Sequence, residues 1–153
     1  MKRLFQTIKK KLISFNNKPT VEKRLTVEAF VLLGISRLVV LFVPMKQFAS
    51  FLGVHMQQTP DTDVTAHQDV LRCVARAIRT AARYTPWESK CFAQAITAKV
   101  MLKHRHLPAT LYLGVAKNKD RNLEAHAWLR CGSKIITGQS GMRRFTVVAC
   151  FGE

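Results

Sequence analysis

Hydrophobic and polar positions follow two different periods along this chain of 153 residues. In the first part, apolar residues recur at intervals of three and four, which is the period of an α-helix. Proline and polar residues interrupt the pattern near Pro19 and again at Pro44. The pattern therefore predicts two or three helices within residues 1–56.

A polar stretch with a proline then separates this region from the next periodic segment. Residues 57–63 are polar and predict a loop. Apolar residues recur at helical spacing over residues 70–82, with arginines among them. We expect Asp61 or Asp63 to cap this helix, because a carboxylate can accept hydrogen bonds from the first main-chain amides.

Another helix is expected to contain Cys91 near its start. The stretch Thr85-Pro86-Trp87-Glu88 has the form of a capping box with proline at the first helical position, and Ser89 is a second candidate cap. If Ser89 is the cap, Cys91 lies in the first turn, where the helix dipole and free amides stabilise a thiolate. Leu107-Pro108 ends the helix.

After Pro108 the period shortens to two, which is typical of β-strands. The four expected strands are residues 109–115, 124–130, 134–137 and 145–151. Short connections suit hairpins and favour antiparallel pairing. The chain is thus expected to be an α+β protein: a helical N-terminal region, 1–56, packs on a core, 57–153, and the two form one compact domain.

The formal net charge of +16 comes from 25 lysines and arginines against 9 acidic residues. Such a surface attracts polyanions, acidic peptides or anionic membranes. A nucleic-acid binder would show basic residues interleaved with exposed aromatics, a zinc module or a helix-turn-helix pattern. We find none of these three patterns in the sequence. We therefore expect an acidic partner or membrane surface and no nucleic acid.

The first segment is basic, and Leu4, Ile8 and Leu12 fall on one helical face. It carries no small-residue cleavage site, so it does not predict a secretory signal. It can lie on an anionic membrane, although a solvated basic helix shows the same pattern. The apolar run 29–43 contains Arg37 and is shorter than the roughly 20 residues of a spanning helix, so we expect a buried or interfacial helix there. We expect a cytoplasmic protein, with peripheral membrane contact through the first segment left open.

Three of the four cysteines lie in apolar runs, where a free thiol packs as a small hydrophobic group. These are Cys73, Cys131 and Cys150. No Cys-x-x-Cys pair and no histidine-carboxylate cluster has metal-ligand spacing, so we expect neither a metal nor a cofactor. The dispersed cysteines also do not predict a disulfide framework.

Cys91 stands apart because His126 follows it 35 residues later in a strand-like run. A cysteine attacks as its thiolate, and a histidine beside it can take the thiol proton and return it to a leaving group. Alternation puts His126 and Trp128 on one face of the strand and Ala127 on the other. From spacing alone, a buried thiol and a structural histidine remain alternatives to a catalytic pair.

The chain resembles the transglutaminase-like B proteins of lasso-peptide biosynthesis over residues 64–151. The matching motifs are Cys91-Phe92-Ala93-Gln94-Ala95, Leu111-Tyr112-Leu113-Gly114-Val115, Ala125-His126-Ala127-Trp128-Leu129 and Phe145-Thr146-Val147. The resemblance implies a transglutaminase-like or papain-like fold and a cysteine peptidase with Cys91 as nucleophile and His126 as base. Its substrate would be the leader of a ribosomally made precursor, whose core passes to a separate ATP-dependent macrolactam cyclase. The implied partner is a separate leader-recognition protein.

One feature departs from this resemblance. An acidic residue is expected about a dozen positions after the histidine, and this chain has Gly138 there, with no Asp or Glu between His126 and Glu153. Thr137, Gln139 or a main-chain carbonyl could orient the imidazole, or the pair could act as a dyad. A non-catalytic peptide- or nucleic-acid-binding module on the same fold, and acyl transfer to an amine, stay open as alternatives.

Two further features of a cleft follow from the same reasoning. The main-chain amide of Cys91 is an expected oxyanion donor if the helix begins near Ser89, whereas Gln94 is expected at the surface or in packing. Trp87 and Trp128 either flank the cleft or pack in the core, and core packing is favoured.

Overall fold

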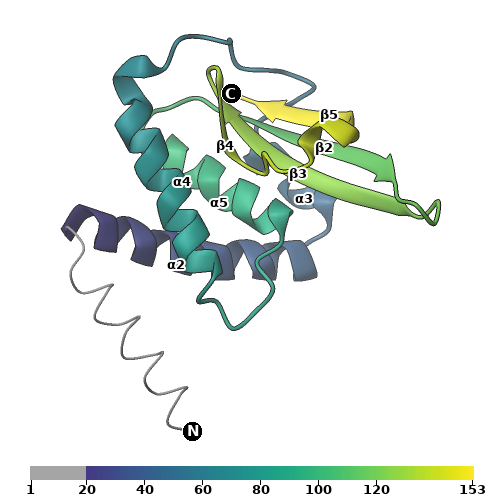
Figure 1. Cartoon of the computed structure of the whole chain (residues 1–153), viewed down its shortest axis with the longest axis horizontal. Coiled ribbons are helices and arrows are strands. Elements are labelled where there is room, and N and C mark those ends of the chain that lie inside the picture. The colour runs from purple at the N-terminus through teal and green to yellow at the C-terminus, as the bar shows by residue number, and fades with distance from the viewer. Residues whose placement is uncertain (1–19) are drawn as a thin grey trace, which may run out of the picture.

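The computed structural model describes residues 20–153, and the basic first segment discussed above lies outside this range. Helices fill the first half of the described chain, and antiparallel strands fill most of the second half (Figure 1). Helices α4 and α5 lie between the sheet and α2, so the molecule has a sheet layer and stacked helices. The expected α+β class is confirmed.

The described part of the N-terminal helical region consists of one long helix, one short helix and a 3₁₀ turn. Helix α2 spans Thr20–Phe42, Pro44 interrupts the chain as expected, and α3 (Met45–Phe48) continues into a 3₁₀ turn at Ala49–Leu52. The inner face of α2 packs against α4 and α5. Within the described chain, α2 alone is long and apolar enough to cross a membrane, with a mean hydropathy of 2.1, and only 28% of its most apolar window is buried.

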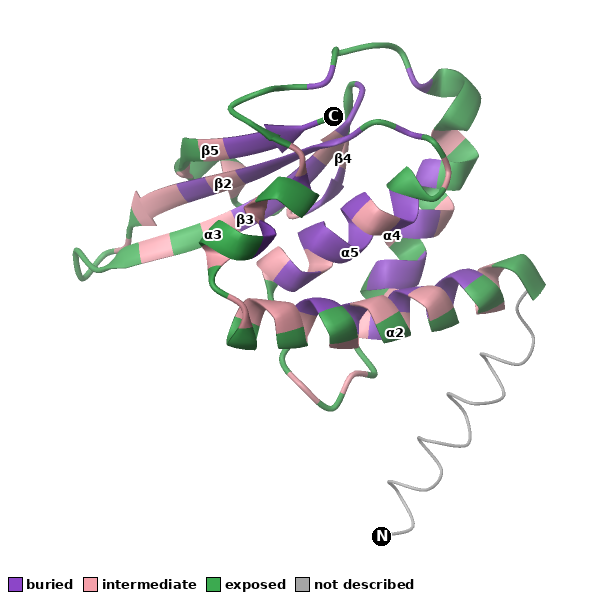
Figure 2. Cartoon of the chain, turned by 180° about the vertical axis from the view of Figure 1, so that it is seen from behind, coloured by how far each residue is buried: buried purple, intermediate pink, exposed green. Residues whose placement is uncertain are grey.

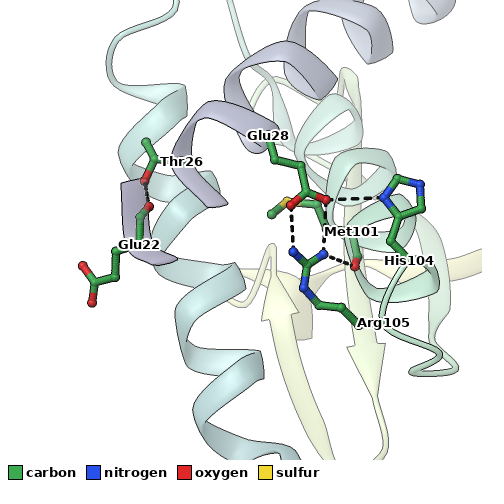
Figure 3. Close-up of polar contacts among 6 residues, drawn as sticks. All are labelled: Glu22, Thr26, Glu28, Met101, His104 and Arg105. Atoms are coloured by element: carbon green, nitrogen blue, oxygen red, sulfur yellow. Dashed lines mark hydrogen bonds and ion pairs between the residues drawn. The ribbon is translucent and has the colours of Figure 1, made fainter. Parts of the chain in front are cut away.

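Polar contacts attach α2 firmly to α5 (Figure 3). The guanidinium of Arg105 donates to both carboxylate oxygens of Glu28, at 3.2 and 2.7 Å, and also to the main-chain oxygen of Met101 at 2.6 Å. Ser36 Oγ and Thr97 Oγ1 lie 3.1 Å apart in the buried interface. Buried polar groups need such partners, so these pairs fix the orientation of α2 on the domain.

Helix α4 spans Gln68–Ala82, and α5 spans Cys91–Lys103. The prediction that Asp61 or Asp63 caps the long helix is wrong. Asp63 instead accepts hydrogen bonds from the amide and hydroxyl of Thr65, where a short 3₁₀ turn, Thr65–His67, precedes α4. The extra turn separates the carboxylate from the first amides of α4.

The second half forms one antiparallel sheet of five strands, in the order β1-β5-β2-β3-β4. The strands are β1 (Val54–His55), β2 (Thr110–Lys117), β3 (Leu123–Cys131), β4 (Lys134–Thr137) and β5 (Thr146–Gly152). All four predicted strands are present. The fifth, β1, falls where helix was expected, because two residues are too few to show a period and their strand form depends on pairing with β5.

The two faces of the sheet bury different side chains. Leu111, Ala127 and Leu129 are at most 1% exposed and belong to the main core, which the helices share. On the other face, the rings of Tyr112 and Trp128 stack with centroids 5.6 Å apart. The alternation inferred for β3 therefore separates Ala127 from Trp128 as expected.

Among residues 20–153, Lys99 is the one charged residue that is buried. Lys99 of α5 is 4% exposed, and its Nζ donates to the main-chain oxygens of Ala109, at 2.6 Å, and Phe151, at 3.3 Å. Burial lowers the pKa of Lys99, partly opposed by the charge of Glu153. The ammonium thereby joins α5 to β5 and to the residue preceding β2.

Candidate active site

The segment before α5 is irregular, and the helix begins at Cys91 itself. Its N-cap residue is Lys90, which is in extended conformation, and no side chain caps the helix. Both predicted caps are therefore wrong. Thr85 Oγ1 instead lies 3.1 Å from the main-chain oxygen of Trp87 and 2.8 Å from Ser89 Oγ. These local bonds stabilise a turn in place of a helical start.

Cys91 is consequently the first helical residue. The first hydrogen bond across the start of α5 runs from the amide of Gln94 to the main-chain oxygen of Lys90, at 3.1 Å. Helical geometry gives the amides of Cys91, Phe92 and Ala93 no intrahelical acceptor. Because these amides and the helix dipole favour negative charge, the position can stabilise both a thiolate and an oxyanion.

His126 is oriented by the main chain of another segment. Its Nε2 lies 2.8 Å from the main-chain oxygen of Gly138. A carbonyl oxygen can only accept, so Nε2 carries the hydrogen and Nδ1 of the neutral ring is left with a free lone pair. The ring lies against Phe145 and Trp128, with centroids 5.0 and 6.0 Å away. These contacts hold the imidazole in the orientation and tautomer that a general base needs.

Gly138 takes the place of the missing acidic residue through its backbone. Of the groups considered from the sequence, the main-chain carbonyl is the one that bonds the imidazole, whereas Thr137 Oγ1 is buried and has no hydrogen-bond partner in the described part of the chain. Gly138 has a φ of +74°, and a Cβ there would lie 2.3 Å from the main-chain oxygen of Ala127 and 2.7 Å from Trp128 Cβ. A side chain, acidic or otherwise, does not fit this backbone.

Cys91 and His126 line one pocket of about 480 Å³. Its walls come from α4, the first turn of α5, β4 and residues 138–140. The fold thus brings together two residues that are 35 positions apart in sequence. Among residues 20–153, the structure records no hydrogen bond between the thiol and the imidazole.

Gln94 also belongs to the pocket, although the sequence predicted it only at the surface or in packing. Gln94 Nε2 donates to the main-chain oxygen of Ser89 at 2.7 Å, which fixes the segment leading into Cys91. Its position one turn after Cys91 was the available signal. Trp87 packs on Phe30 of α2, with centroids 5.4 Å apart, and Trp128 is 6% exposed, so neither tryptophan lines this pocket.

The remaining thiols and charged groups were compared with the predictions for cysteines and metals. Cys131 and Cys150 are buried, Cys73 is half-buried, and all are free thiols. Burial raises the pKa of Cys131, opposed in part by Arg130. Within the described residues, no group of three or more histidine, cysteine or acidic residues could hold a metal. Arg79 of α4 adds a positive charge to the pocket, and none of its described lining residues is acidic.

A comparison with protein families matches residues 35–150 to the Transglutaminase-like superfamily. The matched region is more than half of the chain and includes both Cys91 and His126. Comparisons with curated proteins and with solved structures gave no match. The fold of this chain, a helical part followed by an antiparallel sheet, agrees with the family match. The chain belongs to the transglutaminase-like superfamily, whose fold is compatible with a cysteine peptidase.

Proposed function

We propose that this protein is a cysteine peptidase that removes the leader from a ribosomally made lasso-peptide precursor. The observation that carries the proposal is the shared pocket, which Cys91 enters from a helix N-terminus and His126 from a strand. The matched motifs around both residues support the substrate class. A separate ATP-dependent cyclase then closes the macrolactam on the released core.

The chemistry requires only groups that line this pocket. Nδ1 of His126 takes the proton of the Cys91 thiol, and the sulfur adds to the carbonyl carbon of the scissile peptide. The oxyanion is stabilised by the amides at the start of α5. The carbon–nitrogen bond then breaks, and the imidazolium gives its proton to the leaving amine, which is the new N-terminus of the core.

The second half-reaction regenerates the enzyme. His126 takes a proton from water, the hydroxyl oxygen adds to the thioester carbon, and the carbon–sulfur bond breaks. The leader leaves with a C-terminal carboxylate, and the thiolate is restored. Gly138 keeps the imidazole in the required tautomer but supplies no negative charge, so the imidazolium gains less stabilisation than an aspartate would provide.

Substrate delivery is assigned to a separate leader-recognition protein, as in the stand-alone members of the group that this chain resembles. The excess of basic residues, 25 against 9, supports an acidic leader or an acidic recognition partner. Complementary charge would speed the encounter without determining the cleavage position.

The decisive experiment is leader removal by purified protein together with precursor peptide and recognition partner, followed by mass spectrometry. We expect cleavage by the unmodified chain and by Cys73→Ala. The second variant tests whether the half-buried thiol of α4 is needed for cleavage. Cys91→Ala and His126→Ala are expected to lose cleavage by at least about a thousandfold. Complete leader removal by both of these variants would overturn the assignment.

Added amine distinguishes hydrolysis from acyl transfer. The same thioester can be attacked by an amine, so a product carrying the amine on the leader carboxyl would assign the protein as a transferase. A free carboxylate in excess amine is the outcome expected for a peptidase.

A further inference from the structure

The pocket beside Cys91 contains a buried hydroxyl with no protein partner. Thr137, the last residue of β4, is 8% exposed, and its Oγ1 has no hydrogen-bond partner among residues 20–153. A buried hydroxyl left unpaired costs about 1–3 kcal/mol, so native structures rarely contain one without a reason. The same residue lines the pocket. Because Oγ1 itself is covered by neighbouring atoms, the side chain must rotate about χ1 toward the pocket before a ligand there can give the hydroxyl its missing partner.

A cation without a counter-charge lines the same pocket. Arg79 of α4 is exposed, and none of the ion pairs among the described residues includes it. By contrast, Arg76 on the same helix pairs with Glu22 at 2.8 Å. Because no acidic side chain of the described chain lines the pocket, Arg79 is available to pair with a ligand.

We propose that Arg79 and Thr137 form a subsite for a carboxylate side chain of the substrate, beside the bond that Cys91 attacks. Arg79 supplies charge-assisted hydrogen bonds and the Thr137 hydroxyl supplies a neutral donor. Only the statement that the bound carboxylate belongs to a substrate rests on the proposed peptidase function. It names the substrate class as a peptide with aspartate or glutamate close to the cleaved bond.

Alkylation of Cys91 tests the subsite without requiring any peptide cleavage. Iodoacetate and iodoacetamide both react by displacement of iodide by the thiolate, and they differ in one negative charge. We expect the ratio of their rates at Cys91, measured by peptide mass spectrometry at about pH 8, to exceed the ratio at Cys73 in the same sample by about fivefold or more.

Variants show whether Arg79 and Thr137 cause the preference. Arg79→Gln should lower the ratio at Cys91 by about fivefold, and the isosteric Thr137→Val by about twofold, with iodoacetamide rates little changed. Arg72→Gln removes the same charge from α4 at an exposed position outside the pocket. It should leave the ratio of the two alkylation rates at Cys91 unchanged. Equal ratios at Cys91 and Cys73, or an Arg79→Gln ratio like that of the unmodified chain, would overturn the subsite even if leader cleavage is demonstrated.

A different observation carries a second inference: the outer face of α2 is apolar. After Arg24, every exposed side chain of α2 is large and hydrophobic, and Figure 2 shows exposed positions recurring along the helix. They are Val27, Val31, Ile35, Leu38, Leu41 and Phe42, each between 51 and 77% exposed. Intervals of three and four put them on one face, about 22 Å long at the helical rise. Soluble domains rarely leave such a continuous face uncovered.

The charges around this apolar face indicate what covers it. Both acidic residues of α2 are already paired, Glu22 with Arg76 and Glu28 with Arg105. The segment 1–19 that leads into α2 carries six lysines and arginines and no acidic residue. A second copy would add the same excess of positive charge and neutralise none of it, whereas anionic lipid headgroups would neutralise it.

We infer that α2 lies in the plane of an anionic membrane surface with this apolar face in the headgroup region. The contacts of its inner face to α4 and α5, including the Glu28–Arg105 pair, keep the helix on the domain and exclude a spanning orientation in this fold. Binding then combines apolar burial with electrostatic attraction, as in other interfacial helices. The pocket of Cys91 plays no part in it, so this inference is independent of the peptidase proposal.

Vesicle flotation of the full chain tests the surface. We expect it to bind vesicles containing about 30% phosphatidylglycerol in phosphatidylcholine and to bind pure phosphatidylcholine much less. The double variant Ile35→Gln/Leu38→Gln should weaken binding to the anionic vesicles by about tenfold or more, because both side chains would leave the interface. Val148→Gln, at an exposed apolar position of β5, is the matched control and should bind normally.

Three results would overturn the membrane inference. One is equal flotation with the two vesicle types. Another is unchanged binding by the double variant. The third is a dimer of the unmodified chain in sedimentation that Ile35→Gln/Leu38→Gln dissociates, which would assign the face to a second copy.

Discussion

His126 and Gly138 are joined by a hydrogen bond of 2.8 Å between the imidazole Nε2 and a main-chain carbonyl oxygen. In a nucleophile-base-acid arrangement, the third residue fixes the tautomer and orientation of the histidine and stabilises its positive charge. A carbonyl can perform the first of these tasks and contributes only a dipole to the second. The site is therefore best described as a cysteine-histidine pair with a backbone orienting group.

Adding a side chain at Gly138 should damage the site. We expect Gly138→Ala and Gly138→Asp to lower stability by about 2–4 kcal/mol, from backbone strain at φ +74° and from the clash with Ala127 and Trp128. Leader cleavage should fall in parallel, because the carbonyl that orients His126 must move. Chemical denaturation and the cleavage assay measure the two effects.

Gly141 provides a matched control for this prediction. Its φ of +75° is nearly the same, but a Cβ there would meet no atom closer than 4.0 Å. Gly141→Ala should therefore show the strain alone, about 1 kcal/mol, and retain cleavage. If Gly138→Asp matched or exceeded the activity of the unmodified chain, the main-chain role assigned to Gly138 would be wrong.

Cys91 should be the most reactive thiol of the chain. Cys73 is also half-exposed but lies in the second turn of α4, beyond the free amides of the helix start. At neutral pH we expect iodoacetamide to modify Cys91 at least about tenfold faster than Cys73, and Cys131 and Cys150 slowest of all. Time-resolved peptide mass spectrometry gives the four rates.

The control for reactivity is His126→Ala, which removes the base and leaves the helix N-terminus in place. We expect an intermediate rate at Cys91, because the helix amides still favour the thiolate. Equal rates at Cys91 and Cys73 in the unmodified chain would favour the non-catalytic binding module over the peptidase.

The Glu28–Arg105 contact should make stability depend on pH. Hydrogen bonds from Arg105 hold the pKa of the Glu28 carboxyl below its ordinary value of 4.5, although burial opposes the shift. A lowered pKa in the folded state gives stability that is fully present above about pH 4.5 and is lost as pH falls through the folded value. At neutral pH, Glu28→Gln should cost on the order of 1 kcal/mol, because the pair is partly exposed.

Thermal unfolding of both proteins across the acid range measures this contribution. The gap between the unmodified chain and Glu28→Gln should be constant near neutrality and shrink in the acid range. Glu22→Gln is the control, since its partner Arg76 is 56% exposed and the loss should be smaller. A gap for Glu28→Gln that stays constant down to about pH 3 would contradict the linkage.

Complex formation with the precursor or its recognition partner should weaken with salt. The net charge of +16 favours acidic ligands through interactions that added ions screen. We expect affinity to fall by about threefold or more between roughly 50 and 200 mM salt, as measured by calorimetry. An affinity that is independent of salt would assign recognition to apolar or uncharged contacts.

Local patterns were sufficient for most of the fold. The change from a period of 3.6 to a period of 2 after Pro108 predicted the α+β class and four of the five strands, because each period reflects one buried face of a local element. The strand β1 was missed, since its two residues become a strand only through pairing with β5. The caps were wrong for a similar reason: Thr85 and Ser89 bond to each other and to the preceding turn.

The candidate site divides in the same way. The residue types and the order of Cys91 and His126 were visible in sequence, because thiol and imidazole chemistry belongs to particular side chains. The partner of His126 was not, because every residue carries a main-chain carbonyl and only the tertiary fold decides which one meets the ring. The unpaired hydroxyl of Thr137 and the uncovered face of α2 likewise depend on what the rest of the chain leaves beside them.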